Sequence, residues 1–232
     1  AIPALILGML FTTSVRRTFR LNFPPLSVWV IAALLALTLH PVSVVLLGQI
    51  QGFFPQLPES VTQQFAQLLD PNLSFWKAIF VIAITPAICE ELAFRGFILS
   101  GFNQTGRYGI AILLSSLLFG LFHMIPIQVF NASVLGLVLG LIAIRGNSLF
   151  PCILFHIIYN SLNVIRSRVT PQNFPVSGWK EKFFTYQYHI INGTEQAELK
   201  YNFPLLLLCL LIAIPLLYRL LIWKSPEEEW DE

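Results

Sequence analysis

Five ionisable residues interrupt the long apolar stretches in the middle of the sequence. They are two glutamates, one arginine and two histidines: Glu90, Glu91, Arg95, His123 and His156. An ionisable side chain at membrane depth costs at least about 2.5 kcal/mol, and such residues therefore mark functional sites by default. Carboxylate and imidazole groups can also act as general bases toward water. The five residues predict a reactive site inside a membrane.

Spacing separates the roles of the two glutamates. Residues four apart share one face of a helix, so Glu91 and Arg95 can form an ion pair in the favourable order. Glu90 is turned away by about 100°. Its charged form is disfavoured in a low-dielectric site, as a general base for water requires. The simpler alternatives are a stapling pair for Glu91 and Arg95, and a protonated core residue for Glu90.

A polar stripe marks the apolar stretch 148–165. Its members are spaced four, four and three residues apart: Cys152, His156, Asn160 and Asn163. We expect such a stripe to face the interior of a helix bundle, because the surrounding lipid offers no hydrogen bonds. His156 and Asn160 can each donate a hydrogen bond toward a shared point, which is how an oxyanion is held in peptide hydrolysis.

A second imidazole belongs to another apolar stretch, 109–125. There Ser116, Phe119 and His123 share a helix face, so His123 can point into the same cavity. A lone buried histidine is usually a satisfied core residue. Histidines, an asparagine and an unpaired glutamate on three separate helices favour a site instead.

These residues must be positioned by membrane helices. The sequence is 56% hydrophobic and only 11% charged, against about 25% charged in soluble domains. A spanning helix needs about 20 mostly apolar residues, and we expect an all-α, multi-pass transmembrane bundle of six to seven spans with a membrane-embedded polar cavity. The candidates are 1–15, 27–49, 74–102, 109–125, 127–144, 148–165 and 203–223.

The chain divides into three parts around this site. We expect N-terminal spans with an amphipathic surface segment at 59–69, a catalytic core, and a polar loop at 166–202 with the last span and an acidic tail; the parts are residues 1–73, 74–166 and 167–232. Ala132, Gly136 and Gly140 recur every four residues and predict a close helix contact.

Three motifs carry a resemblance to a known family. Residues 90–95 have the form EExxxR, 119–123 the form FxxxH, and 156–160 the form HxxxN. In this order on successive membrane helices, they resemble the CAAX-protease and bacteriocin-processing family of intramembrane peptidases, which is related to the type II CAAX prenyl endopeptidases.

The resemblance implies catalytic roles for four residues, Glu90, His123, His156 and Asn160. The first two would hold and activate a water molecule, and the last two would stabilise the tetrahedral oxyanion. Glu91 and Arg95 would support the site by orienting it. The implied enzyme is a glutamate-type intramembrane peptidase without a cofactor, although a glutamate with two histidines can also bind zinc.

The implied partners are membrane lipid and a membrane-associated peptide or protein substrate, of which prenylated tails are one class. We expect a multi-pass protein of the cell membrane. Nucleic acid is not expected, because the 14 Lys and Arg residues form no basic stripe. Because the sequence starts within an apolar segment, we also expect a longer polypeptide or a membrane complex.

Other proteolytic chemistries fit the sequence less well. Its aspartates, Asp70 and Asp231, lie outside the expected spans, and no HExxH zinc motif occurs. Cys152 is four residues before His156 and could be a nucleophile.

Two alternatives come from other functional classes. A proton- or ion-coupled transporter would also place ionisable residues at the midplane, but the sequence shows no paired broken helices. A catalytically silent scaffold or immunity-type membrane protein is the other alternative.

Overall fold

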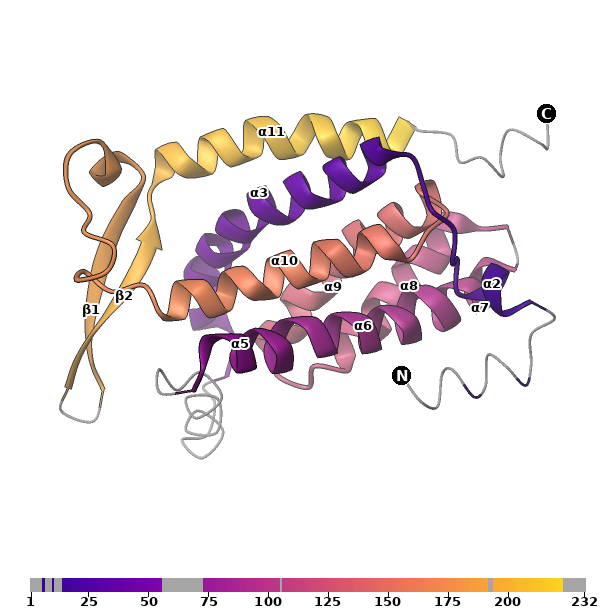
Figure 1. Cartoon of the computed structure of the whole chain (residues 1–232), viewed down its shortest axis with the longest axis horizontal. Coiled ribbons are helices and arrows are strands. Elements are labelled where there is room, and N and C mark those ends of the chain that lie inside the picture. Colours follow the sequence, from indigo (N-terminus) through magenta and orange to yellow (C-terminus); the bar gives the residue numbers. More distant parts are fainter. Residues whose placement is uncertain are drawn as a thin grey trace.

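The computed structural model is a bundle of helices with one β-hairpin at its end (Figure 1). It describes residues 6, 10, 14–55, 73–104, 106–191 and 194–222. The helices outside the central motif segment are α2 (Val15–Thr18), α3 (Leu26–Ile50), the 3₁₀ turn η1 (Gln51–Phe53), α8 (Tyr108–Leu121), α9 (Pro126–Arg145), α10 (Phe150–Ser167) and α11 (Phe203–Ile222). The expected amphipathic segment 59–69, the acidic tail and most of the expected first span lie outside the described residues.

One unbroken helical stretch carries the EExxxR motif. It consists of α5 (Phe75–Ala78), the π-helical η2 (Ile79–Ile84), α6 (Thr85–Glu91), the π-helical η3 (Leu92–Ile98) and α7 (Leu99–Asn103). Its length agrees with the expected helix over 74–102. The two π-helical parts were not expected, and such turns occur frequently at functional sites.

The core is formed where α3, α9, α10 and α11 meet. Among its fully or almost fully buried side chains are Leu35, Leu139, Phe155 and Leu220. In Figure 1, α10 crosses the middle of the bundle between α3 and α6. This central position buries the helix that carries two of the expected site residues.

The small residues of α9 allow α8 to approach closely. A Cβ atom added to Gly136 would lie 2.9 Å from Ser116 Cβ, and one added to Gly140 would lie 2.9 Å from Ile112 Cγ2. Larger side chains would force the two helices apart. The predicted close contact at these glycines is confirmed.

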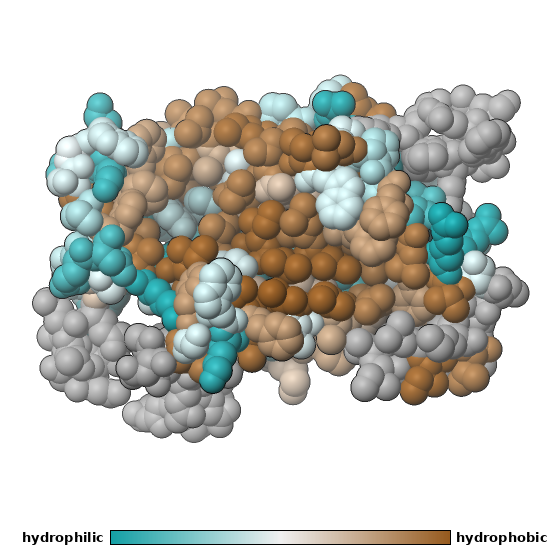
Figure 2. Space-filling model, in the orientation of Figure 1, coloured by the Kyte–Doolittle hydropathy of each residue, from teal (hydrophilic) through white to brown (hydrophobic). Residues whose placement is uncertain are grey.

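The surface agrees with a membrane protein. Apolar side chains cover the middle of the face shown in Figure 2, and hydrophilic ones gather toward its two ends. Among the described residues, three helices are long and apolar enough to span a membrane, namely Leu26–Phe53, Pro126–Arg145 and Phe203–Ile222. The all-α membrane bundle is confirmed, whereas the count of six to seven spans stays a prediction.

A β-hairpin replaces most of the polar loop expected at 166–202. Strand β1 (Phe184–Ile191) pairs antiparallel with β2 (Thr194–Tyr201), after the 3₁₀ turn η4 (Gly178–Lys182). The expectation of a loop is wrong here, although the sequence held the signal: aromatic and branched residues alternate along 184–190, and Asn-Gly follows at 192–193. An Asn-Gly pair between two such runs is the strongest short-range hairpin signal.

Candidate active site

Glu91, Arg95 and His156 form a buried ionic group at the centre of the bundle. Arg95 Nη1 donates to Glu91 Oε1 at 3.0 Å, as the spacing predicts. His156 Nδ1 lies 2.8 Å from the same oxygen. An ionised carboxylate only accepts, so the imidazole donates through Nδ1. Glu91, the last residue of α6, therefore joins the π-helical η3 to α10, a contact that spacing within one helix does not predict.

Glu90 lies on the other side of the same imidazole. Its Oε2 is 3.8 Å from His156 Nε2, so the ring stands between two carboxyl groups. This Oε2 atom is buried and finds no hydrogen-bond partner among the described residues. A buried carboxylate oxygen without such a partner is costly, which fits a group held for a ligand or a water molecule rather than for the fold.

His123 belongs to a turn and not to the helix on which we expected it. Helix α8 ends at Leu121, and Met124 has a φ of 60° in the turn that follows. His123 Nδ1 lies 2.9 Å from the carbonyl oxygen of Phe119. Because a carbonyl only accepts, Nδ1 carries the proton and Nε2 of the neutral ring is an acceptor. Both His123 and His156 are close enough to Glu90 for electrostatic interaction.

Phe119 connects the two imidazoles with the arginine. Its ring makes edge contacts with His123 at 5.0 Å and with His156 at 5.9 Å between centroids. Arg95 Cζ lies 4.1 Å from the centre of the same ring, within the range of cation–π attraction. The sequence placed Phe119 in a motif but gave it no role; the structure makes it the side chain against which three polar groups pack.

Asn160 lies one helical turn beyond His156 on α10. Its Nδ2 donates to the carbonyl oxygen of Ile82 at 3.3 Å, within the π-helical η2. An amide nitrogen has two donor hydrogens, so one hydrogen remains for another acceptor. The structure brings Glu90, Glu91, Arg95 and His156 together and His123 near them, and it attaches Asn160 to the adjoining π-helical turn.

The alternative nucleophile Cys152 is buried against α9. Its side chain is fully buried, and Sγ contacts the carbonyl oxygen of Leu139 on α9 at 3.4 Å. That placement disfavours cysteine chemistry, because a nucleophile must reach its substrate. Among the described residues, no three His, Cys, Asp or Glu side chains are grouped as ligands for a metal ion.

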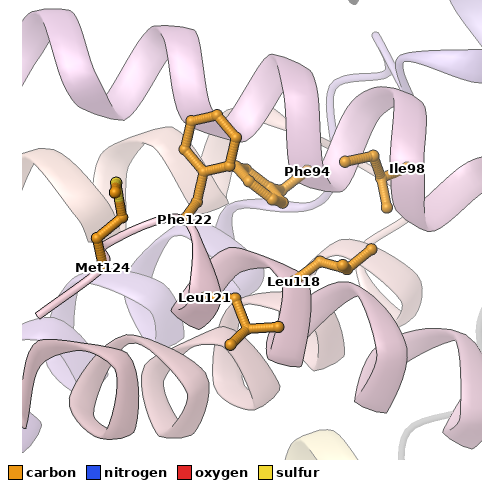
Figure 3. A pocket seen from close by; sticks show the side chains of 6 residues that line it. All are labelled: Phe94, Ile98, Leu118, Leu121, Phe122 and Met124. Atoms are coloured by element: carbon orange, nitrogen blue, oxygen red, sulfur yellow. The ribbon is translucent and has the colours of Figure 1, made fainter. Parts of the chain in front are cut away.

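An apolar pocket of about 390 Å³ adjoins the polar group (Figure 3). Its lining side chains are Phe94, Ile98, Leu118, Leu121, Phe122 and Met124. Two of them flank His123 in the sequence, and a third precedes Arg95. The Phe94 ring contacts that of Phe119 at 5.1 Å. Phe94 therefore connects the pocket lining to the Phe119 ring, which contacts both imidazoles.

A second buried imidazole was overlooked in the sequence. His40 of α3 is fully buried, and its ring contacts Asn163 of α10 and Tyr201 of β2. The signal in the sequence was a histidine inside an apolar span.

The comparisons with known proteins agree with the motifs. Residues 72–162 match the family described as type II CAAX prenyl endopeptidase Rce1-like. The matched range contains all seven motif residues from Glu90 to Asn160. No curated protein and no solved structure matches the chain. Over residues 72–162, the chain is therefore similar to the CAAX-protease family that includes the type II CAAX prenyl endopeptidases.

Proposed function

We propose that this chain is an intramembrane endopeptidase that hydrolyses a peptide bond of a membrane-associated substrate. The family match supports a peptidase in general terms. The observation that carries the proposed mechanism is the imidazole of His156, held between Glu91 at 2.8 Å and Glu90 at 3.8 Å inside an apolar bundle. Residues 74–166 form the catalytic core in this proposal, and the segments before and after them flank it.

The first step is the activation of water by Glu90 and His123. Since His123 Nδ1 donates to the Phe119 carbonyl, its Nε2 accepts one hydrogen of the water. The second hydrogen points to the Glu90 carboxylate. Glu90 takes that proton as the water oxygen bonds to the scissile carbonyl carbon, which is general-base catalysis.

The second step is the stabilisation of the oxyanion by His156 and Asn160. Because His156 Nδ1 donates to Glu91, its Nε2 is the atom that faces the reaction. This Nε2 donates only in the imidazolium form, whose charge the Glu91 carboxylate stabilises. Asn160 contributes its remaining amide hydrogen. Glu90 then passes its proton to the leaving amine nitrogen as the carbon–nitrogen bond breaks.

Glu91 and Arg95 are positioning residues in this scheme. Arg95 balances the charge of Glu91 at 3.0 Å, and Glu91 fixes the orientation of the His156 ring. A carboxylate has the same function in other catalytic sites, where it holds a histidine in one tautomer. No cofactor enters any step.

The substrate reaches the site from within the membrane in this proposal. The pocket beside His123 is lined by apolar side chains, so it suits an apolar part of a membrane-associated peptide. Prenylated tails are one class of such substrates, as the name of the matched family indicates. The cell membrane is the proposed location.

The test compares two glutamate variants of the full chain in lipid nanodiscs. Quenched fluorescent peptides, with and without a prenyl group, report cleavage. Glu90→Gln should lower kcat/KM by about 10²- to 10⁴-fold, the usual contribution of a general base. Glu181→Gln, an exposed residue of η4, is the control and should cleave normally.

The same variants separate the proposal from its alternatives. Cleavage by Glu90→Gln at the wild-type rate would contradict the proposed mechanism. If no peptide is cleaved by the wild type but Glu90→Gln abolishes a proton flux, the chain is a transporter component. If the substitution changes no activity, a scaffold is the better explanation.

A further inference from the structure

The buried imidazole of His40 takes no part in the proposed chemistry, yet both of its ring nitrogens have partners. Nε2 lies 3.1 Å from Asn163 Oδ1, and Nδ1 lies 3.4 Å from the hydroxyl of Tyr201. The rings of Tyr159 and Tyr201 contact it edge-on at 5.3 and 5.9 Å. Helix α3, helix α10 and the last residue of β2 therefore meet at one side chain.

The hydrogen bonds of Asn163 define the direction of this network. Asn163 Nδ2 donates to the carbonyl oxygen of Tyr159 at 3.4 Å, which directs the amide oxygen toward His40. His40 Nε2 must then donate to that oxygen, and His40 Nδ1 accepts from the Tyr201 hydroxyl. The neutral ring satisfies both nitrogens at once, so neither α10 nor β2 can shift without breaking a buried hydrogen bond.

Helix α10 presents one polar group after another to different neighbours. His156 contacts α6 and Asn160 contacts η2. Asn163 contacts α3, and Arg166 contacts Glu198 of β2 at 2.7 Å. Asn163 follows Asn160 by three residues and lies on the same side of the helix. A rotation of α10 that moved Asn163 away from His40 would therefore also move the amide of Asn160.

We propose that His40 is a positioning residue that, through Asn163, holds α10 in the rotation at which Asn160 stands beside the reacting group. The predicted effect on catalysis rests on the proposed peptidase function. The structural part of the inference, that His40 fixes the rotation of α10, does not rest on it. The contact between His40 and Tyr201 also connects the hairpin to this side chain. One imidazole therefore fixes both the strands and the catalytic helix.

The first experiment measures kinetics per folded enzyme in five variants, three single substitutions described here and two that include Asn160→Ala. His40→Phe keeps an aromatic ring but removes both hydrogen bonds, and His40→Gln keeps a donor for Asn163. Thr38→Val is the matched control, because Thr38 is also buried in α3 but its hydroxyl bonds only to carbonyls of its own helix. We expect His40→Phe to lower kcat by about 10- to 100-fold, as a small misplacement of a catalytic group does, with KM unchanged.

The remaining outcomes distinguish positioning from stability. His40→Gln should recover most of the rate, and Thr38→Val should keep the wild-type kcat even if it unfolds at a lower temperature. Adding His40→Phe to Asn160→Ala should cost little more than Asn160→Ala alone, because residues that act through one another are not additive. Full additivity, or an equal loss of kcat in Thr38→Val, would overturn the positioning role.

A second measurement does not depend on cleavage. Hydrogen–deuterium exchange should rise in peptides covering 156–167 of His40→Phe, with exchange in 108–121 unchanged as the internal reference. Unchanged exchange in 156–167 would refute the inference that His40 fixes α10. If exchange rises as expected while the wild type cleaves no peptide, the proposed function fails but the inference that His40 fixes α10 stands.

Discussion

The imidazole of His156 donates through Nδ1 to Glu91 Oε1 at 2.8 Å and presents Nε2 to Glu90 Oε2 at 3.8 Å. The two adjacent glutamates of the EExxxR motif thus lie next to different nitrogens of the His156 ring. Glu91 Oε1 is paired with Arg95 at 3.0 Å, whereas no ion pair with an arginine or a lysine is found for Glu90 among the described residues. Adjacent residues of the same type consequently have different surroundings, and in the proposed mechanism Glu91 holds the ring while Glu90 acts on the water.

This difference predicts that two matched substitutions lower stability by different amounts. Glu91→Gln leaves the buried guanidinium of Arg95 without its counter-charge, which should lower the free energy of unfolding by about 3–5 kcal/mol. Glu90→Gln leaves the Glu91–Arg95 pair intact and should change stability much less. Thermal unfolding of both variants in the same nanodiscs measures the difference. Equal stability of the two variants would show that the pair does not support the fold.

Phe119 should affect activity more than its burial alone explains. Phe119→Leu keeps an apolar side chain but removes the ring that contacts both imidazoles and Arg95. We expect a loss of cation–π attraction of about 0.5–2 kcal/mol and a fall in kcat. Phe155→Leu is the control, since that ring is also buried but stacks on Tyr159. A comparable loss of kcat per folded enzyme in both variants would remove the special role of Phe119.

Filling the apolar pocket should change substrate preference. Leu118→Trp places a larger ring in the pocket of about 390 Å³, and we expect kcat/KM to fall about tenfold or more for peptides with a bulky apolar group beside the scissile bond. Peptides with alanine there should be cleaved as before. Leu117→Trp, a similarly exposed neighbour on α8 that does not line the pocket, is the control. The same preference in both variants would mean that substrates do not use this pocket.

Acid should loosen the hairpin from α10. Burial alone would raise the pKa of Glu198, but hydrogen bonds from Lys200 and Arg166 and their charges outweigh it and lower this pKa below its ordinary value of 4.5. A lowered folded-state pKa contributes stability above the unfolded value, and that stability is lost as pH falls through the folded value. We therefore expect proteolytic nicking of the hairpin to increase below about pH 4.5.

The control for this pH effect is Glu198→Gln. This variant cannot titrate at the position, so its hairpin should be equally accessible to protease at pH 7 and at pH 4. A wild-type hairpin that shows no change between these pH values would contradict the expected contribution of Glu198.

The membrane fold and the family relation follow from sequence features that are local or compositional. The apolar composition demands lipid as the solvent, and helices are the simplest way to satisfy the backbone there. The i,i+4 spacing of Glu91 and Arg95 is enough to predict their pair, because both residues belong to one helix. The hairpin could also have been predicted from its alternating strand and its Asn-Gly pair.

The contacts between helices were decided only by the tertiary structure. The contact of Glu91 with His156 and the contact of His40 with Asn163 join residues far apart in the sequence. Such contacts depend on the rotation and depth at which each helix packs, and a one-residue change in either turns a side chain by about 100°. The sequence by itself determined which residues could react, and the packing of α10 against its neighbours decided which of them meet.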